Sequence, residues 1–535
     1  MSAAAAGASD GGSDQAGTWR PAGNPWLIAI VVTLAAFMEV LDSTIVNVAL
    51  PHIAGSMSAS NDESTWVLTS YLVANGIVLM ISGFFTRLLG RKRYFLICIV
   101  MFTVCSFLCG VSTNLTELII FRVLQGFFGG GLQPNQQSII LDTFPPARRA
   151  AAFGVTAMAT IVAPVLGPVL GGFITDNASW RWIFLMNIPI GVIAFFGVTA
   201  LVQDPPWLKM AGKIRASVDY IGLGFITLGL GAFQIMLDRG EDADWFSSGF
   251  IQLMALFAVI GIVGAIYWLL YAKNPIVNLR VMVDRNFAVG CLMIAGMAIV
   301  LYSSSVLIPQ LAQQQLGYTA TLSGLVLAPG ALALIFLIVI VGRLMTVIPA
   351  KYIISFGFLF LAAAFVYSSH LASDIDFATL VKMRIAQTMG LGFLFVPISS
   401  IAYLTVPAKM NGDAAALFTM FRNVAGSIGI SVASALVTTR GQVRTAYLSS
   451  HLTPFSQGYA DLLSKTSQTL QAGGHTLAAA QQSAKAMIDQ TLGTQANILA
   501  YGDVFILCAA LSLAVVPFTF LLSSAKVEQS AEGSH

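Results

Sequence analysis

Charged side chains are scarce in this chain. Asp, Glu, Lys and Arg supply only 10% of the 535 residues, whereas hydrophobic residues supply 57%. Soluble domains carry about 25% charged residues, so this composition excludes a soluble enzyme, a disordered chain and a nucleic-acid-binding protein. A spanning helix takes about 20 apolar residues, and the hydrophobic content is sufficient for about fourteen of them. The net charge of +3 gives no indication of an acidic partner.

Cysteine and histidine are also rare, and neither gathers into a site. The five cysteines lie within apolar runs, at Cys98, Cys105, Cys109, Cys291 and Cys508. Thiols there behave as small hydrophobic side chains, so neither a disulfide scaffold nor a metal site is expected. The five histidines lie at or beyond the expected membrane edges, which disfavours an intramembrane haem. No G-x-x-x-x-G-K-[ST] loop occurs, so ATP is not expected as the energy source. We expect no enzyme activity.

Apolar runs of spanning length recur along the whole chain. The fourteen expected spans cover about 26–50, 66–86, 94–112, 115–141, 151–174, 182–202, 220–237, 250–271, 287–310, 320–341, 352–371, 379–405, 414–438 and 500–522. The loops on one side of these spans hold most of the Lys and Arg, and the short loops on the other side hold only Arg181 and Arg239. Because positive residues stay cytoplasmic, we expect both termini inside, with a disordered tail over 1–25 and a second tail over 523–535.

One connection on the outer side is unusually long. Residues 440–498 are mostly polar, with amphipathic stretches around 456–471 and 476–492. A Gly473-Gly474 break separates the two stretches, and Thr476 is placed to cap the second helix. Long extramembrane connections are often functional or disordered. Two interpretations stay open: a solvated helical cap, or a docking surface for a partner outside the cytoplasm.

An internal repeat gives the architecture. A shift of 262 residues places Arg122 on Arg384, Gln125 on Gln387, Gly130 on Gly392, Ser138 on Ser400, Ile139 on Ile401 and Pro145 on Pro407. The fourth span is thus repeated as the twelfth. Internal symmetry of this kind is typical of transporters. A shift of eight helices predicts a 6+2+6 arrangement: a six-helix bundle over 26–202, two inserted helices within 203–285, and a second bundle over 286–522 that includes the periplasmic connection 440–498.

Five motifs in order are similar to those of a known family. They are Leu41–Pro51, Gly83–Arg93, Arg122–Gly126, Gly167–Gly172 and Trp180–Phe184. Nearly the whole chain resembles the fourteen-helix drug:proton antiporters of the major facilitator superfamily. Within that group, the segments Gln234–Gly240 and Asp244–Ser248, together with the long outer connection, resemble the inner-membrane subunits of tripartite multidrug pumps.

The resemblance implies a fold, a location and partners. The fold would be the all-α major facilitator fold with two pseudo-symmetric six-helix bundles, in the bacterial inner membrane. The function would be export of lipophilic or amphipathic drugs in exchange for protons, with a role in antibiotic resistance. The proton gradient would be the energy source, without a cofactor. A periplasmic adaptor protein and, through it, an outer-membrane channel would be the partners.

The loop motif of the family departs from its usual pattern at one position. Gly83, Gly90, Arg91 and Lys92 match the motif, but Arg87 stands where the family usually has an aspartate. A gating salt bridge built on that aspartate is therefore in question here.

Two acids lie inside the first expected span. Glu39 and Asp42 are three positions apart, so they share a helix face and we expect them to point into one cavity. Two carboxylates this close do not both ionise readily, and burial favours the neutral form of each. Such a pair can hold and release one proton, as coupling to a proton gradient requires. Asp42 is the stronger candidate because it lies in the family motif.

A basic residue offers an alternative role for these acids. Arg122 in the fourth span can approach the first span, where it would either favour proton release or form a structural ion pair with one acid. Aligning Pro51 with Pro309 puts Val300 opposite Asp42, so the corresponding helix of the second bundle has no acid. Proton exchange is therefore expected in the first bundle.

The remaining candidates concern the substrate and the gate. Arg384 and Arg422 either snorkel to an interface or attract anionic or weak-acid substrates. Uncharged cavity candidates are Asn75, Gln133, Asn135, Gln136 and Gln137, and Tyr302, Phe393 and Phe395 are candidate aromatic wall or packing residues. The family's antiporter motif is represented by Gly167, Pro168, Gly171 and Gly172. Its small residues permit close helix contact and its proline bends the helix, as a gate or as a plain structural kink.

Three functions remain in competition. The first is proton-coupled export of many lipophilic compounds. The second is a stand-alone transporter of one metabolite or fatty acid. The third is a membrane scaffold or receptor that moves no solute. Charged residues inside the membrane favour transport over the third function, because a scaffold does not need them.

Overall fold

The computed structural model describes residues 23–205, 219–372, 375–407, 410–451, 457–474 and 476–522. The expected tail over 1–25, apart from its last three residues, and the expected tail over 523–535 lie outside these ranges. Within the described residues the regular secondary structure is entirely helical, which confirms the all-α class.

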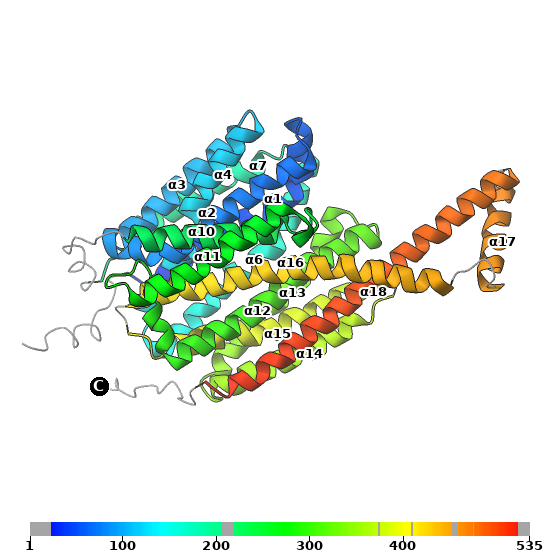
Figure 1. The fold of residues 1–535 in the computed structure, drawn as a ribbon. Coiled ribbons are helices and arrows are strands. Elements are labelled where there is room, and N and C mark those ends of the chain that lie inside the picture. Colours follow the sequence, from blue (N-terminus) through cyan, green and yellow to red (C-terminus); the bar gives the residue numbers. More distant parts are fainter. Residues whose placement is uncertain are drawn as a thin grey trace, which may run out of the picture.

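Thirteen helical stretches of the described chain are long and apolar enough to cross a membrane, with Leu115–Thr143 and Trp182–Leu201 each counted as one span. The bent pair Arg148–Pro164 and Leu166–Asn177 makes a fourteenth. The elements in chain order are α1 (Pro25–Ser56), α2 (Asn61–Leu89), α3 (Arg91–Val111), α4 (Leu115–Gly129), α5 (Leu132–Thr143), α6 (Pro146–Asn177), α7 (Trp182–Leu185), α8 (Asn187–Leu201), α10 (Tyr220–Arg239), η2 (Trp245–Ser247), α11 (Gly249–Tyr271), η3 (Leu279–Val283), α12 (Arg285–Gln310), η4 (Leu311–Gln315), α13 (Ala320–Leu344), α14 (Ala350–Ser369), α15 (Phe377–Ala402), α16 (Asn411–His451), α17 (Gln457–Ala472) and α18 (Leu477–Thr519) (Figure 1). The chain is a multi-pass membrane protein, as expected.

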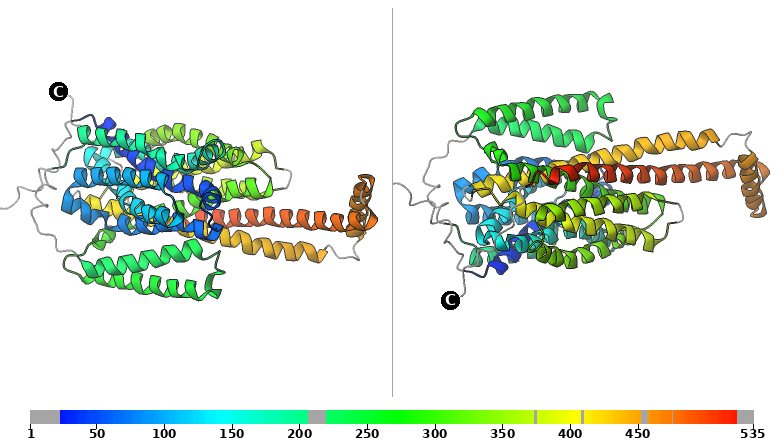
Figure 2. Two further views of the ribbon diagram at one scale, coloured as in Figure 1. Left: turned by 90° about the horizontal axis from the view of Figure 1, so that it is seen from above. Right: turned by 90° about the horizontal axis from the view of Figure 1, so that it is seen from below.

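The long helices run side by side, so the membrane domain has two ends (Figures 1 and 2). We call the end at which α1 begins and α18 ends the proximal end, and the opposite end the distal end. At the proximal end Asn24 caps α1 by accepting a hydrogen bond from the backbone N of Trp26 (2.9 Å), and Pro25 follows as the first helical residue. Such caps provide acceptors for backbone N–H groups that have no carbonyl partner within the helix.

The helices form two groups and a separate pair. Helices α1 to α8 pack on one another, and α12 to α18 form the second group. The pair α10 and α11 lies at the side of the molecule, where α10 contacts α2 and α16 (Figure 2). A side chain on Gly261 would come within 2.2 Å of the backbone N of Gly229, so the two helices of the pair cross at a distance that only glycine permits.

The fourth expected span is divided into α4 and α5. The break falls at Gly130 and Gly131, directly after Gly129, the last residue of α4. A Cβ on Gly130 would lie 2.5 Å from the backbone O of Asn75, so α2 approaches this turn more closely than any side chain would allow. The break places the polar residues of α5 in the interior of the domain, where nearly all of them are buried.

The long connection is built differently from expectation. We predicted spans that end at 438 and begin again at 500, but α16 has 41 residues and α18 has 43, without interruption. At 1.5 Å per residue each helix is about 60 Å long, roughly twice the hydrocarbon core. Both helices therefore project beyond the distal end, and α17 lies across their tip (Figures 1 and 2). We call residues 440–451, α17 and 477–498 the distal extension. The predicted cap is confirmed, since Thr476 accepts from the backbone N of Ala479 (3.4 Å).

Candidate functional site

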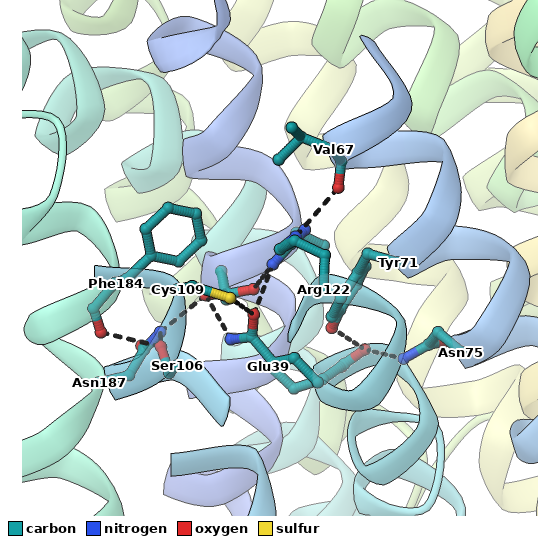
Figure 3. A network of polar contacts seen from close by, with 12 residues as sticks. Glu39, Val67, Tyr71, Asn75, Ser106, Cys109, Arg122, Phe184 and Asn187 are labelled. Carbon is teal, nitrogen blue, oxygen red and sulfur yellow. Dashed lines mark hydrogen bonds and ion pairs between the residues drawn. The ribbon is translucent and has the colours of Figure 1, made fainter. Parts of the chain in front are cut away.

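Asp42 and Arg122 form a buried ion pair between α1 and α4. Nη1 of Arg122 lies 2.6 Å from Oδ2 of Asp42, and both side chains are fully buried. The Nε of Arg122 donates to the backbone O of Val67 (3.1 Å), and Nη1 also donates to Oε1 of Gln125 (2.9 Å) (Figure 3). The guanidinium lies 4.0 Å from the centre of the Tyr71 ring, at cation–π distance. Arg122 is thus fixed on several sides.

The second oxygen of Asp42 is also occupied. Its Oδ1 accepts from Nε2 of Gln125 (3.0 Å) and from Nδ2 of Asn187 (2.7 Å), at the start of α8. Asn187 donates in turn to Oγ of Ser106 on α3 (3.0 Å). The carboxylate therefore has a full set of donors and a matching cation. Removing one member of such a pair costs about 3–5 kcal/mol, because the other charge stays buried without compensation.

Glu39 lies one turn earlier on α1 and has a different set of partners. Its Oε1 accepts from Nδ2 of Asn75 (2.9 Å) and from the hydroxyl of Tyr71 (3.3 Å) (Figure 3). Its Oε2 accepts from Nε2 of Gln133. All three donors are neutral, and in the described part of the chain Glu39 forms no ion pair. A buried carboxylate held only by neutral donors readily accepts a proton.

The two acids therefore do not form the single shared pair that we expected. Asp42 is neutralised by Arg122, whereas Glu39 is not. Tyr71 joins the two sets of partners, because its hydroxyl donates to Glu39 while its ring faces the guanidinium of Arg122.

Gln133 connects Glu39 to the second bundle. While Nε2 of Gln133 donates to Glu39, its Oε1 accepts from Nη2 of Arg422 on α16. Arg422 is fully buried, and its Nη1 has no hydrogen-bond partner among the described residues. Tyr302 of α12 packs against Gly426 of α16, one turn after Arg422, where a Cβ on the glycine would lie 2.5 Å from the tyrosine ring. Four predicted cavity residues, Asn75, Gln133, Tyr302 and Arg422, thus meet at the contact between the bundles.

Arg384 is surrounded by hydroxyl groups instead of an acid. Its Nη1 donates to Oγ of Ser304 (2.9 Å) and its Nη2 to Oγ of Ser305 (3.1 Å), both on α12. Gln387 donates to Oγ of Ser368 (2.9 Å), and Ser368 occupies the place that Ser106 has in the first bundle by the same shift of 262 residues. Arg384 is fully buried and, within the described residues, unpaired with any acid, so it does not snorkel to an interface.

Other predicted cavity residues lie nearer the proximal end. The hydroxyl of Tyr403 donates to Oε1 of Gln137 (2.8 Å), and Thr86 donates to Oδ1 of Asn135 (3.3 Å). Gln136 donates to Thr33 (3.1 Å) and Thr156 (2.8 Å). These amides bond to neighbouring helices, so the structure does not bring them to the centre with Gln133.

A cluster of charges joins the two bundles at the proximal end. Arg87 forms an ion pair with Asp413 in the first turn of α16, and Arg91 forms one with Asp142 at the end of α5. Asn411 donates to the other oxygen of Asp142 (3.1 Å). We call Arg87, Arg91, Asp142, Asn411 and Asp413 the proximal latch. The departure at Arg87 is matched by an acid on the other bundle, so a salt bridge is present here with the cation at position 87.

The glycines of the loop motif make room for these contacts. A Cβ on Gly83 would lie 2.6 Å from Oδ1 of Asp413. Gly90 has a φ of +83°, which favours glycine, and lets Oδ1 of Asp204 accept from the backbone N of Lys92 (2.8 Å). Sequence reasoning did not identify Asp413; the signal available was the arginine at 87, which requires an acid elsewhere.

The antiporter motif brings α6 against the helix that carries the acids. A Cβ on Gly167 would lie 2.3 Å from Oγ1 of Thr44, and one on Gly171 would lie 3.0 Å from the backbone O of Ile45. Gly172 is buried on the same helix. The two parts of α6, Arg148–Pro164 and Leu166–Asn177, meet at an angle of 42°. The predicted bend is therefore present just before Pro168, and Pro164 ends the first part.

Comparisons with known proteins agree with this architecture. Residues 32–430 match the family model described as Major Facilitator Superfamily. The chain is 36% identical over 491 residues to the multidrug export protein EmrB of Escherichia coli strain K12, covering 92% of this chain and 94% of that protein. It is 34% identical over 494 residues to the fatty acid resistance protein FarB of Neisseria gonorrhoeae, covering 92% and 95%. The crystal structure of the human organic anion transporter MFSD10 covers 91% of this chain and 99% of its own with a TM-score of 0.55; at 13% identity this likeness concerns the fold alone.

Proposed function

Because the chain belongs to the major facilitator superfamily, we propose that it exports lipophilic or amphipathic compounds from the cell in exchange for protons. The bundles over 26–202 and 286–522 would rock against one another and open the central contact to each side in turn. We assign the proximal end to the cytoplasm, in keeping with the positive loops, and the membrane to the bacterial inner membrane. The proximal latch then holds the cytoplasmic side closed.

The observation that carries this proposal is the chain of contacts from Glu39 through Gln133 to Arg422. It joins Glu39, which forms no ion pair among the described residues, to Arg422, whose Nη1 has no hydrogen-bond partner there, and it crosses from one bundle to the other. A proton on Glu39 removes the charge that Gln133 faces and so weakens one link between the bundles. A lipophilic substrate that enters this contact from the other side can disturb the same link. The proton and the substrate thereby disturb the same contacts between the bundles, so that binding of one can be coupled to release of the other, as exchange requires.

Asp42 and Arg122 have a related role in the proposal. Since both oxygens of Asp42 are occupied, the pair keeps α1 and α4 together for as long as Asp42 stays ionised. Glu39 is the group placed to exchange its proton directly, and Asp42 exchanges only when the pair with Arg122 opens. The close contact of Gly167 and Gly171 with α1 would seal the site on one face.

The range of substrates distinguishes the main proposal from its alternative. The similarity to a multidrug export protein favours a broad range, and the similarity to a fatty acid resistance protein favours the narrower alternative. The test is transport into proteoliposomes under an imposed pH gradient, with a panel of lipophilic drugs, fatty acids and polar metabolites. We expect uptake of several unrelated lipophilic compounds that an uncoupler abolishes. Uptake of one compound only would favour a stand-alone transporter of one metabolite or fatty acid. Uptake of none would favour a membrane scaffold or receptor.

We further propose that the protein is the inner-membrane component of a tripartite pump. The distal extension supports this proposal, because two helices of about 60 Å reach well beyond a bilayer core of about 30 Å. A periplasmic adaptor would bind this extension and lead the substrate to an outer-membrane channel.

A further inference from the structure

The last turn of α10 carries a third acid that the central site does not use. Nε2 of Gln234 donates to Oδ1 of Asp238 (3.0 Å), one turn apart on the helix. The other oxygen, Oδ2, is out of contact with solvent and has no hydrogen-bond partner in the described part of the chain. Asp238 lies at the distal end, on the face of α10 that contacts α2 and α16.

Asp238 forms no ion pair with any described residue, although the charge of the neighbouring Arg239 acts on its carboxylate. Arg239, next in the chain, directs its guanidinium to Oγ1 of Thr65 and over the ring of Trp66 (5.2 Å), both on α2. The groups that face Asp238 from α2 and α16 are hydroxyls: Thr69 lies against the carboxylate, and Ser431 donates to the backbone O of Leu237 (2.7 Å).

The other charged residues on the elements around Asp238 stand at separate positions of those elements. Helix α11 has none; α2 has Asp62 and Glu63 in its first turn; α16 has Arg422 and Arg440 on either side of the contact; and Glu241, after α10, accepts from Thr438 (2.7 Å). An ionised carboxylate with one oxygen buried and without a donor is costly, whereas the neutral acid can turn its O–H toward a hydroxyl. The geometry therefore favours proton binding at Oδ2.

Gln234 makes this acid part of the contact between the inserted pair and the second bundle. Its Nε2 lies within hydrogen-bond distance of both Oδ1 of Asp238 (3.0 Å) and Oγ of Ser427 on α16 (3.3 Å). Ser427 is one turn from Asn423, which accepts from Nε of Arg422 (3.3 Å) in the central site. A change of charge on Asp238 thus changes how Gln234 divides its donors between α10 and α16.

We propose that Asp238 is a second proton-binding group, through which the inserted helices take part in the exchange cycle. A proton from the distal solution forms an O–H bond on Oδ2, the carboxylate becomes neutral, and the hydrogen bond of Gln234 moves toward Ser427. The effect on transport rests on the proposed function, but proton binding itself does not.

Proton binding is tested on the full chain in lipid nanodiscs by infrared difference spectroscopy between about pH 5 and pH 9, a range in which buried carboxyl groups titrate. We expect a carbonyl band of a protonated acid that is lost in Asp238→Asn, moves in frequency in Asp238→Glu, and is unchanged in Asp242→Asn, the matched control on an exposed residue of the following loop. If Asp238→Asn is not recovered folded, the frequency shift in Asp238→Glu decides. Spectra of the recovered Asp238 variants identical to that of the unmodified chain would overturn the proposal.

The transport consequence is measured as the ratio of protons to dye in proteoliposomes, with ethidium and rhodamine 6G as the probes. We expect Asp238→Asn to lower the ratio and Asp238→Glu to restore it. If the unmodified chain exchanges no protons for dye, the proposed function fails while the infrared result still decides for or against Asp238. If the unmodified chain exchanges protons and Asp238→Asn has the same ratio, the coupling role of Asp238 alone is wrong.

Discussion

The guanidinium of Arg87, at the end of α2, pairs with the carboxylate of Asp413 in the first turn of α16. This places a cation on the first bundle and an anion on the second. The negative charge also lies at the start of a helix, where the helix dipole favours it. The pair therefore stabilises the arrangement in which the proximal ends are together.

Reversing one charge of this pair should favour separation of the proximal ends, and reversing both should restore their contact. We expect Arg87→Asp or Asp413→Arg to reduce transport at least several-fold, since like charges then face one another across the contact. The double variant should recover much of it. Distances between spin labels on the two bundles report whether the proximal ends are together. Arg93→Ala, on an exposed residue in the first turn of α3, is the control. A double variant no better than either single one would contradict the role of the pair.

The buried pair of Asp42 and Arg122 should dominate stability in the first bundle. Arg122→Ala leaves a buried carboxylate without its cation, and we expect a loss of about 3–5 kcal/mol. Arg122→Lys should recover only part of this, because one ammonium cannot reach Asp42, Gln125 and the backbone O of Val67 together. Thermal unfolding in detergent measures both variants.

A double-variant comparison distinguishes the ion pair from simple packing. Asp42→Asn combined with Arg122→Gln should unfold at a higher temperature than Arg122→Ala alone, because no unpaired charge is left. Equal loss in the two would show that the charges are not what stabilises this contact.

The contact of Gly167 with Thr44 should not tolerate a larger residue. In Gly167→Val a Cβ 2.3 Å from Oγ1 of Thr44 forces α6 away from α1, so we expect transport to be lost in a chain that still reaches the membrane. Gly76→Ala on α2 is the matched control, because its Cβ would meet nothing within 4 Å. Transport assays on membranes with equal amounts of each variant give the answer, and normal transport by Gly167→Val would contradict the assigned packing.

The distal extension should be separable from transport itself. A side chain on Gly441 would come within 2.7 Å of Oδ1 of Asn497, so α16 and α18 are adjacent there, and after removal of 450–495 residues 442–449 remain to link the two helices. We expect the shortened chain to transport drugs in proteoliposomes but to lose co-purification with a periplasmic adaptor and to lose drug tolerance in cells. Retained co-purification would assign adaptor binding elsewhere.

Sequence patterns identified the parts of the site that lie within single helices. The spacing of Glu39 and Asp42, the charge of Arg122 and the repeat to Arg384 are all readable in the chain, because a charge inside an apolar run stands out. The helical class and the number of spans are readable because each span is an apolar run of about 20 residues.

Features that depend on contact between distant helices were not readable. Gln133 lies between Glu39 and Arg422 only because α5 meets α16, and Asp413 finds Arg87 across 326 positions of the chain. The lengths of α16 and α18 were missed because hydropathy falls where these helices leave the membrane, although the helices themselves continue.

The central claim is that protons bound in the first bundle drive export, with Glu39 as the group that exchanges. It is tested most directly by counting protons against drug molecules in proteoliposomes that contain the unmodified chain, Glu39→Gln or Asp42→Asn. We expect the unmodified chain to release protons on the side from which it removes drug, and Glu39→Gln to move fewer protons for each drug molecule. Proton movement by Glu39→Gln at the ratio of the unmodified chain would contradict the account.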